Sequence, residues 1–117
     1  MPAATGSEAM SLAHATDADV AEEIARSGDA SLVVLEFWSR TCGPCRMVTP
    51  VLETLAERHD DSLHVVMVDI AGAPETSRRW NVRATPTLIA LRNGEELGRH
   101  SGAIVRGQLV DWVESRL

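Results

Sequence analysis

The stretch that decides the fold runs from residue 31 to residue 50 and reads SLVVLEFWSRTCGPCRMVTP. Residues 31–38 are nearly all apolar and rich in β-branched side chains, which is typical of a central strand covered on both faces. After the two cysteines, apolar side chains recur at helical spacing and predict a helix over about residues 44–58. Cys42 and Cys45 therefore lie where a buried strand gives way to the start of a helix.

This position of the cysteine pair predicts redox chemistry. Free backbone N–H groups and the positive end of the helix dipole stabilise a thiolate on Cys42 and so lower the pKa of that thiol. Pro44 suits the first helical turn, because its missing N–H is no loss there. Cys45 lies one turn inside the helix, close enough to form a disulfide with Cys42 and more shielded from solvent. We therefore expect Cys42 to attack a disulfide and Cys45 to resolve the product.

Two other readings of the pair remain open, a zinc site and a packed pair without function. A zinc site needs two more ligands, and the chain has no second cysteine pair. The four histidines are scattered without ligand spacing: His14, His59, His64 and His100. Because these further ligands are lacking, we predict no metal. The sequence also has no flavin or nicotinamide fingerprint, so we predict no bound cofactor.

Outward from this stretch, strands and helices alternate along the chain. The patterns predict strands at Met10–His14, Leu63–Ile70, Thr87–Arg92 and Glu95–Ser101, and helices at Asp17–Arg26, Pro74–Trp80 and Arg106–Leu117. Asn93-Gly94 joins the last two strands and is a hairpin signal, because both residues tolerate positive φ. This order predicts an α/β fold with a mixed sheet between helical layers. Residues 1–10 are small and polar and are expected to form a flexible arm.

Length and charge narrow the function classes. A chain of 117 residues has the usual size of one domain. The net charge of −6 and the lack of a basic stripe argue against nucleic-acid binding, so we expect no nucleic-acid partner. No apolar run approaches the ~18 residues of a membrane span, and the N-terminus lacks the features of a secretory signal. We expect a cytoplasmic monomer, in which the cysteines are no structural staple because reducing compartments keep thiols reduced.

Residues spread along the chain carry a resemblance to a known family. They are Phe37-Trp38, Cys42-Gly43-Pro44-Cys45-Arg46-Met47, Pro50, Ala84-Thr85-Pro86-Thr87, Arg92-Asn93-Gly94 and Gly102. In their order and spacing, over about residues 15–117, they resemble the thioredoxin family far more specifically than a Cys-x-x-Cys motif alone. The resemblance implies a thioredoxin domain over residues 11–117, with a mixed sheet of four or five strands flanked by about four helices.

The resemblance also implies an activity and its partners. It implies a protein dithiol–disulfide oxidoreductase that mainly reduces client protein disulfides and maintains cell redox homeostasis. A thioredoxin reductase would supply the electrons. Two rival functions stay open: an oxidase or isomerase with the same chemistry, and a binding scaffold in which the cysteines are incidental.

A substrate-binding set follows from the same resemblance. Its members are Trp38, Thr41, Gly43, Pro44, Thr85, Pro86 and Gly102. The resemblance implies a cis peptide bond between Thr85 and Pro86, whose backbone faces the cysteines and pairs with the substrate peptide. Gly102 would let a substrate chain approach closely, although on its own it equally fits a bend at a strand end. Trp38 equally fits a packing role beside the active site.

Glu36 is the polar exception in the buried strand. Desolvation disfavours the charged form of a buried carboxyl group, so the pKa of Glu36 should be raised. A raised pKa suits a general base that takes the proton from Cys45 as it resolves the mixed disulfide, through a water. The alternative is a neutral glutamic acid bonded to a hydroxyl or backbone group, with no kinetic role.

Three positions depart from the family pattern. The family normally has Asp where this chain has Glu36, and the longer side chain brings the carboxyl group nearer the cysteines or bends it away. Thr41 stands where the family usually has Trp, which puts client range in question. Met67 takes the place of a lysine found in many members. Without that cation, the pKa of Glu36 should rise further.

Overall fold

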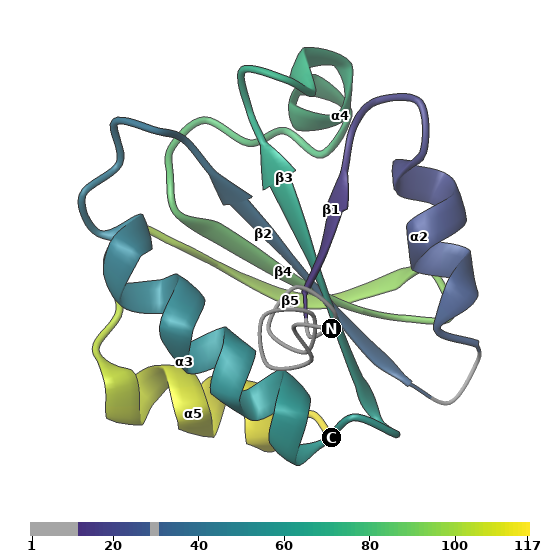
Figure 1. Cartoon of the computed structure of the whole chain (residues 1–117), viewed down its shortest axis with the longest axis vertical. Coiled ribbons are helices and arrows are strands. Elements are labelled where there is room, and N and C mark those ends of the chain that lie inside the picture. The colour runs from purple at the N-terminus through teal and green to yellow at the C-terminus, as the bar shows by residue number, and fades with distance from the viewer. Residues whose placement is uncertain (1–11, 29–30) are drawn as a thin grey trace, which may run out of the picture.

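The computed structural model describes residues 12–28 and 31–117, so the expected arm over residues 1–10 lies outside the described residues. In the described part, five strands form one sheet and four helices flank it (Figure 1). The strands are β1 Leu12–Ala15, β2 Leu32–Trp38, β3 Leu63–Asp69, β4 Thr87–Arg92 and β5 Glu95–Ser101. The helices are α2 Val20–Arg26, α3 Cys45–Arg58, α4 Pro74–Arg79 and α5 Arg106–Glu114. The predicted α/β architecture is confirmed.

The sheet is mixed and has the strand order β1-β3-β2-β4-β5. Strand β2 lies at its centre, parallel to β3 and antiparallel to β4. Strand β1 is a parallel edge strand, as the weak pattern before residue 15 predicts. The carboxyl ends of β1, β2 and β3 therefore meet along one edge of the sheet. This edge runs across the ends of the strands, and the antiparallel strand β4 begins at it.

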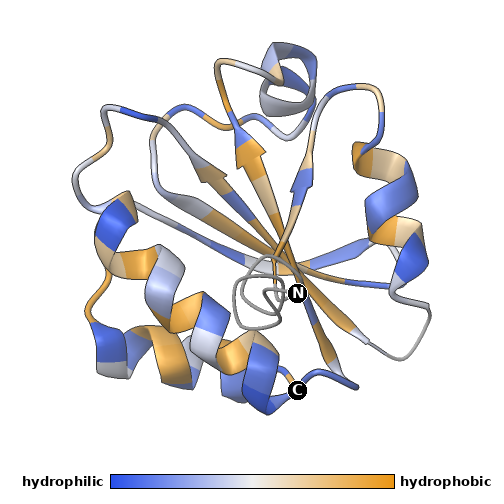
Figure 2. Ribbon diagram, viewed as in Figure 1, coloured by the Kyte–Doolittle hydropathy of each residue, from blue (hydrophilic) through white to orange (hydrophobic). Residues whose placement is uncertain are grey.

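Two hydrophobic clusters cover the two faces of the sheet. Successive strand residues point to opposite faces, and β2 divides accordingly. Leu32 and Val34 belong to the cluster under α3 and α5, whereas Val33, Leu35 and Phe37 belong to the cluster on the side of α2 and α4. Figure 2 shows the result: the inner strands β2, β3 and β4 are mostly apolar and lie between helices with one apolar and one polar side, whereas the edge strand β5 is mostly hydrophilic. Burial on both faces explains why β2 reads as a continuous apolar run.

The first helix is shorter than predicted. The sequence pattern placed its start at Asp17, but α2 begins at Val20 and residues 17–19 form a turn. In this turn the Asp19 carboxylate accepts a hydrogen bond of 2.6 Å from the backbone N–H of Thr16. The Asp17 carboxylate points away and accepts hydrogen bonds from the backbone N–H groups of Glu75 and Thr76, at 3.1 and 2.7 Å. Asp17 thus binds the start of α4 instead of extending α2.

The remaining boundaries agree with the prediction within a few residues. Strand β3 ends one residue early at Asp69, α4 ends at Arg79, and α5 ends at Glu114 because the last turn of the chain is not helical. Asn93 and Gly94 have φ values of 58° and 77°, which confirms the predicted hairpin. None of the helices in the described ranges is both long and apolar enough to cross a membrane.

Candidate active site

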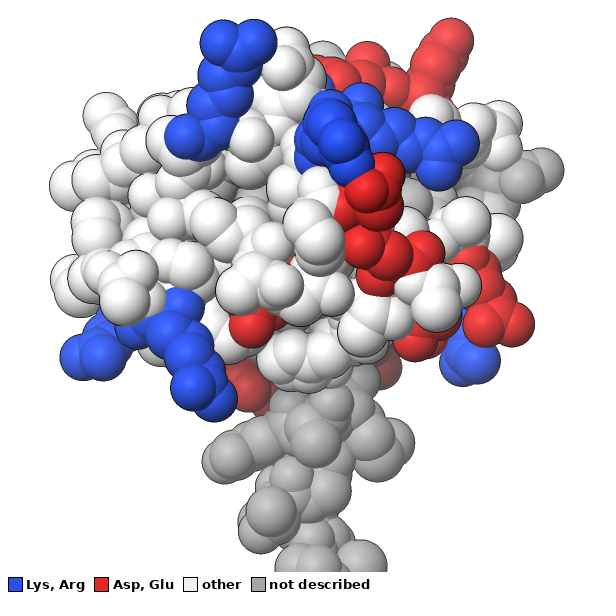
Figure 3. Space-filling view, turned by 90° about the horizontal axis from the view of Figure 1, so that it is seen from above, with Lys and Arg blue, Asp and Glu red and all other residues white. Residues whose placement is uncertain are grey.

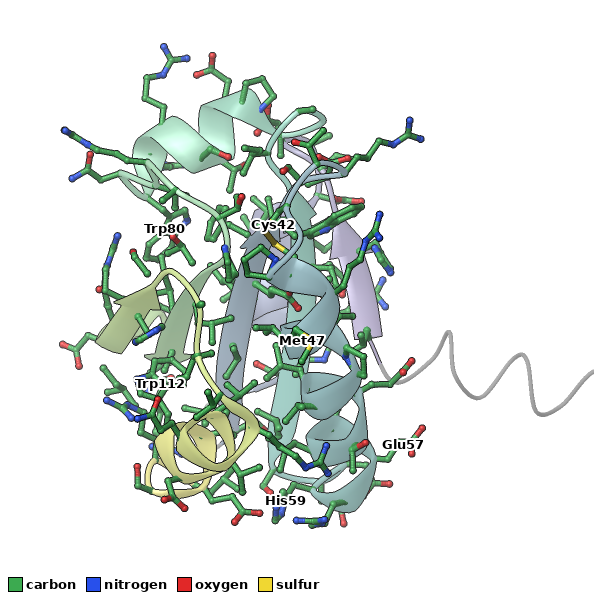
Figure 4. All side chains as sticks on the ribbon, turned by 90° about the vertical axis from the view of Figure 1, so that its left-hand side faces the viewer. Cys42, Met47, Glu57, His59, Trp80 and Trp112 are labelled. Atoms are coloured by element: carbon green, nitrogen blue, oxygen red, sulfur yellow. A yellow bond between two sulfur atoms is a disulfide. The ribbon has the colours of Figure 1, made fainter. Side chains whose placement is uncertain are left out.

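The cysteines lie at the edge of the sheet where β2 ends. The chain leaves β2 at Trp38, turns, and enters α3 at Cys45. The Cα atoms of Cys42 and Cys45 are 5.4 Å apart and the two sulfur atoms form a disulfide, as the sequence predicts. Figure 4 shows this disulfide at the upper end of α3.

The start of α3 supplies a hydrogen bond to one of the two sulfur atoms. The backbone N–H of Cys45 donates to Cys42 Sγ at 3.2 Å. The next two N–H groups donate to the carbonyl oxygens of Gly43 and Pro44, both at 3.1 Å. The exposed fractions are 7% for Cys42 and 4% for Cys45. A thiolate on Cys42 is therefore the one that the helix start stabilises, and Cys45 is slightly the more shielded residue.

The segment that resembles the substrate-pairing backbone lies at the same edge of the sheet. The Thr85–Pro86 peptide bond is cis, as the resemblance implies. Thr87 follows it and pairs with Phe37 of β2, which places Pro86 beside the end of β2. Gly102 has a φ of +95° and donates its N–H to the Pro86 carbonyl oxygen at 2.8 Å. The fold thus brings Pro86 and Gly102 to the end of the sheet that carries the cysteines.

Glu36 is fully buried on the face of β2 that α3 covers. Burial raises the pKa of its carboxyl group to about 7, and a hydrogen bond from Thr49 partly offsets this rise. Its partners across the sheet are Met67 on β3 and Leu88 on β4, neither of which carries charge. The predicted rise of the Glu36 pKa is confirmed, and its main cause is desolvation.

Thr49 is a site residue that the sequence analysis missed. Its hydroxyl lies 2.9 Å from Glu36 Oε2 and 3.1 Å from the Cys45 carbonyl oxygen. The available signal was its position four residues after Cys45, on the same side of α3, as a polar residue next to buried Val48. The contact with Glu36 depends on how α3 packs over β2, which the local sequence does not specify.

The remaining predicted site residues differ in exposure. Thr41, Gly43 and Pro44 are exposed around the cysteine turn. Trp38 is half-buried and packs against the cluster under α3 and α5. Its indole Nε1 is buried and has no hydrogen-bond partner among the described residues. This contact fits a packing role for Trp38, and its contact with a client stays a prediction.

An apolar surface groove lies beside the cysteine turn. It has a volume of about 550 Å³ and runs between the first turns of α3 and the loop that leads into α5. Met47 and Val105 line it and are 72% and 65% exposed. Arg46 and Arg106 also line this groove, and none of the described residues that line it is acidic. Sequence reasoning missed the groove, because its two walls are more than 50 residues apart in the chain.

Charge is distributed unevenly over the end of the molecule that carries the site. Figure 3 looks onto this end, and its left half is largely uncharged, with basic side chains at the margin. Acidic side chains gather on the right half of the same view. Within residues 12–28 and 31–117, no group of three or more His, Cys, Asp or Glu side chains could hold a metal ion.

Comparison with known proteins agrees with this geometry. The family model described as Thioredoxin matches residues 11–115. Thioredoxin 1 of Synechococcus elongatus is 34% identical over 109 residues, which are 92% of this chain and 100% of that protein. The thioredoxin of Mycobacterium tuberculosis is 39% identical over 99 residues, which are 85% of this chain and 84% of that protein.

A solved structure has the same fold. The germline-specific thioredoxin Deadhead of Drosophila melanogaster superimposes with a TM-score of 0.81 at 27% sequence identity. The match covers 90% of this chain and 98% of that one. The paired cysteines at the start of α3 and these relatives lead to one conclusion. The chain belongs to the thioredoxin family and is a thiol–disulfide oxidoreductase.

Proposed function

We propose that the chain works mainly as a reductant of protein disulfides, with Cys42 as the attacking thiolate and Cys45 as the resolving thiol. The observation that carries this proposal is the 3.2 Å hydrogen bond from the Cys45 N–H to Cys42 Sγ. A backbone donor at the start of a helix favours the anion over the thiol. This bond is directed at Cys42, which supports different roles for the two cysteines.

The exchange proceeds in two balanced steps. The Cys42 thiolate attacks one sulfur of the client disulfide, which forms a mixed disulfide and releases the other client sulfur as a thiolate. The Cys45 thiolate then attacks Cys42 Sγ, forms the Cys42–Cys45 disulfide and releases the second client sulfur. Two electrons pass from the dithiol to the client. A thioredoxin reductase that draws on NADPH would restore the dithiol, which fits a cytoplasmic location.

Cys45 must lose its proton before it attacks, and Glu36 is suited to accept that proton. Its carboxyl group is buried next to the first turns of α3, and its pKa of about 7 lies near the pH of the cell interior. A base with such a pKa combines a useful ionised fraction with enough basicity. The proton would move from Cys45 Sγ to Glu36 directly or through one water.

Client peptides would bind across the edge of the sheet that carries the cysteines. The proposed contacts are those of the thioredoxin family: Trp38, Thr41, Gly43, Pro44, Thr85, Pro86 and Gly102. The groove beside Met47 and Val105 extends this surface. Its exposed apolar lining suits an apolar client side chain near the disulfide, and its two arginines favour acidic neighbours.

Reduction of insulin disulfides tests this function. With dithiothreitol as electron donor, we expect the chain to accelerate insulin precipitation strongly over the uncatalysed rate. We also expect NADPH consumption when a thioredoxin reductase replaces dithiothreitol. The double variant Cys42→Ser/Cys45→Ser is the control and should be inactive. No acceleration by the wild-type chain would refute the reductant role, and a strongly oxidising redox potential would favour an oxidase or isomerase.

A further inference from the structure

One hydroxyl group contacts both the buried carboxyl group and the turn that carries the resolving cysteine. Thr49 Oγ1 lies 2.9 Å from Glu36 Oε2 and 3.3 Å from Glu36 Oε1. It also lies 3.1 Å from the carbonyl oxygen of Cys45, one helical turn earlier. Thr49 thus bridges β2 and the first turn of α3.

A hydroxyl has a single hydrogen, so Thr49 cannot donate fully to the Glu36 carboxyl group and to the Cys45 carbonyl oxygen at once. When Glu36 is ionised, its carboxylate is the stronger acceptor and takes the Thr49 hydrogen. When Glu36 is protonated, its O–H can donate to Thr49 Oγ1, and Thr49 can donate to the Cys45 carbonyl oxygen. The direction of the Thr49 hydroxyl therefore follows the proton of Glu36.

Among the described residues, no charged side chain competes with Thr49 for this carboxyl group. Burial and the Thr49 hydrogen bond are the two causes that act on the pKa of Glu36 among the described residues. The strands on either side present Met67 and Leu88. From α3, Cys45 also belongs to the buried part of the helix, and its thiol becomes titratable once the disulfide is reduced. Thr49 is thus the polar partner of Glu36 in a chain that has Met67 where many family members have a lysine.

We propose that Thr49 is a positioning residue, whose hydroxyl holds the Glu36 carboxyl group against the turn of Cys45 and links its proton to that turn. This inference rests on the proposed role of Glu36 as the proton acceptor for Cys45. The hydrogen bonds of the Thr49 side chain go to Glu36 and to the Cys45 carbonyl oxygen, so Thr49 acts through Glu36. A proton that moves from Cys45 to Glu36 would then reverse the Thr49 hydroxyl as part of the resolving step.

A purely structural role for Thr49 has a matched control in the same helix. Thr54 Oγ1 donates to the carbonyl oxygen of Pro50 at 3.1 Å, the same bond to the residue four positions earlier. Thr54 is exposed and has no carboxyl partner among the hydrogen bonds described. Such a bond alone satisfies a helix carbonyl group and does not affect titration. Thr54→Val therefore removes one hydrogen bond of this kind from α3 and leaves the contact between Thr49 and Glu36 intact.

The test measures titration and resolution in the same variants. Carbon-13 NMR of the side-chain carboxyl group reports the pKa of Glu36 in the oxidised protein. A chromogenic aromatic disulfide reports the kinetics, because attack by Cys42 releases one coloured thiol and resolution by Cys45 releases the second. In Thr49→Val, we expect Glu36 to bind its proton about tenfold more tightly, since a hydrogen bond to the charged form is lost. The pH profile of the resolving step should move to higher pH by the corresponding amount, about one pH unit.

Matched variants separate the outcomes. Thr49→Ser should keep both wild-type curves because it keeps the hydroxyl, and Thr54→Val should keep them as well. If Thr49→Val does not fold, Thr49→Ala is measured in its place. An unchanged Glu36 titration in the variant that is measured overturns the inference. A shifted Glu36 titration without a shifted pH profile of resolution overturns it as well. The proposed proton transfer fails by a different result: Glu36→Gln would then resolve the mixed disulfide at the wild-type rate at every pH.

Discussion

Glu36 exchanges full hydration for one hydrogen bond from a neutral hydroxyl. Its side chain is buried between β2 and α3, and Thr49 is its polar partner. One neutral donor does not replace the hydration of a carboxylate, so the folded protein favours the protonated form. The pKa of Glu36 accordingly rises from the ordinary 4.5 to about 7.

This rise predicts a pH-dependent stability. Below pH 4.5, Glu36 is protonated in the folded and in the unfolded chain, so burial carries no charge penalty. Between pH 4.5 and about 7 the unfolded chain ionises first, and the free energy of unfolding falls as the pH rises. The full penalty, present above pH 7, corresponds to about 3 kcal/mol for this difference in pKa.

Glu36→Gln removes this titration. We expect the unfolding free energy of the oxidised variant, relative to wild type, to rise by about 3 kcal/mol between pH 4 and pH 8. Urea unfolding of both proteins across this range measures the difference. Glu95→Gln, in the exposed hairpin strand β5, controls for the loss of one negative charge. Parallel wild-type and Glu36→Gln stabilities at all pH values would mean that Glu36 is not desolvated as described.

At the residue scale, the sequence predicted the properties that depend only on a residue's place within its own strand or helix. A carboxyl group inside an apolar strand had to be buried, so the rise of the Glu36 pKa followed from the pattern alone. The partner of that carboxyl group did not follow, because Thr49 meets Glu36 only after α3 packs across β2. Met67 in place of the family's lysine predicted that Glu36 lacks a nearby cation. It did not predict that the Thr49 hydroxyl on α3 contacts Glu36.

At the element scale, α4 is stabilised by a side chain from outside its own segment. It has six residues, and its N-cap residue Ala73 offers no side-chain hydrogen bond. Asp17, in the turn before α2, accepts hydrogen bonds from the N–H groups of Glu75 and Thr76 and from the Thr76 hydroxyl. The Thr76 hydroxyl bond is the main cause that lowers the pKa of Asp17. A local pattern could not reveal this cap, which explains why α2 was predicted three residues too long.

The cap from Asp17 predicts a local effect on α4. In Asp17→Ala, we expect the amide hydrogens of Glu75 and Thr76 to exchange about fivefold faster near neutral pH. Because the folded pKa of Asp17 is lowered, the protection is present above its ordinary value of 3.8 and is lost as the pH falls through the folded pKa. Hydrogen exchange followed by NMR at two pH values measures both effects. Asp111→Ala, on the exposed side of α5, is the control, and equal exchange in both variants would contradict the cap.

At the scale of the whole molecule, the sheet order brings distant segments to one edge. Strand β2 lies between β3 and β4, so the turn after β2, Pro86 before β4 and Gly102 after β5 meet at its carboxyl end. Ligand sites in such sheets form outside the carboxyl ends of the strands. The alternation of strands and helices predicted the fold class, whereas the strand order was not predicted, because it depends on how distant segments pair. The groove beside Met47 was not predicted, since it exists only once α3 and the loop before α5 lie together.

The central claim is that this edge presents two cysteines with different roles. The most direct measurement is mass spectrometry of the mixed disulfide that each single variant accumulates with a disulfide-containing client peptide. Cys45→Ser keeps the attacking thiolate and cannot resolve, so it should accumulate the mixed disulfide at Cys42. Cys42→Ser lacks the thiolate that the start of α3 stabilises, so it should accumulate little. Accumulation by Cys42→Ser, or equal accumulation by the two variants, would contradict the assignment of Cys42 as the attacking residue.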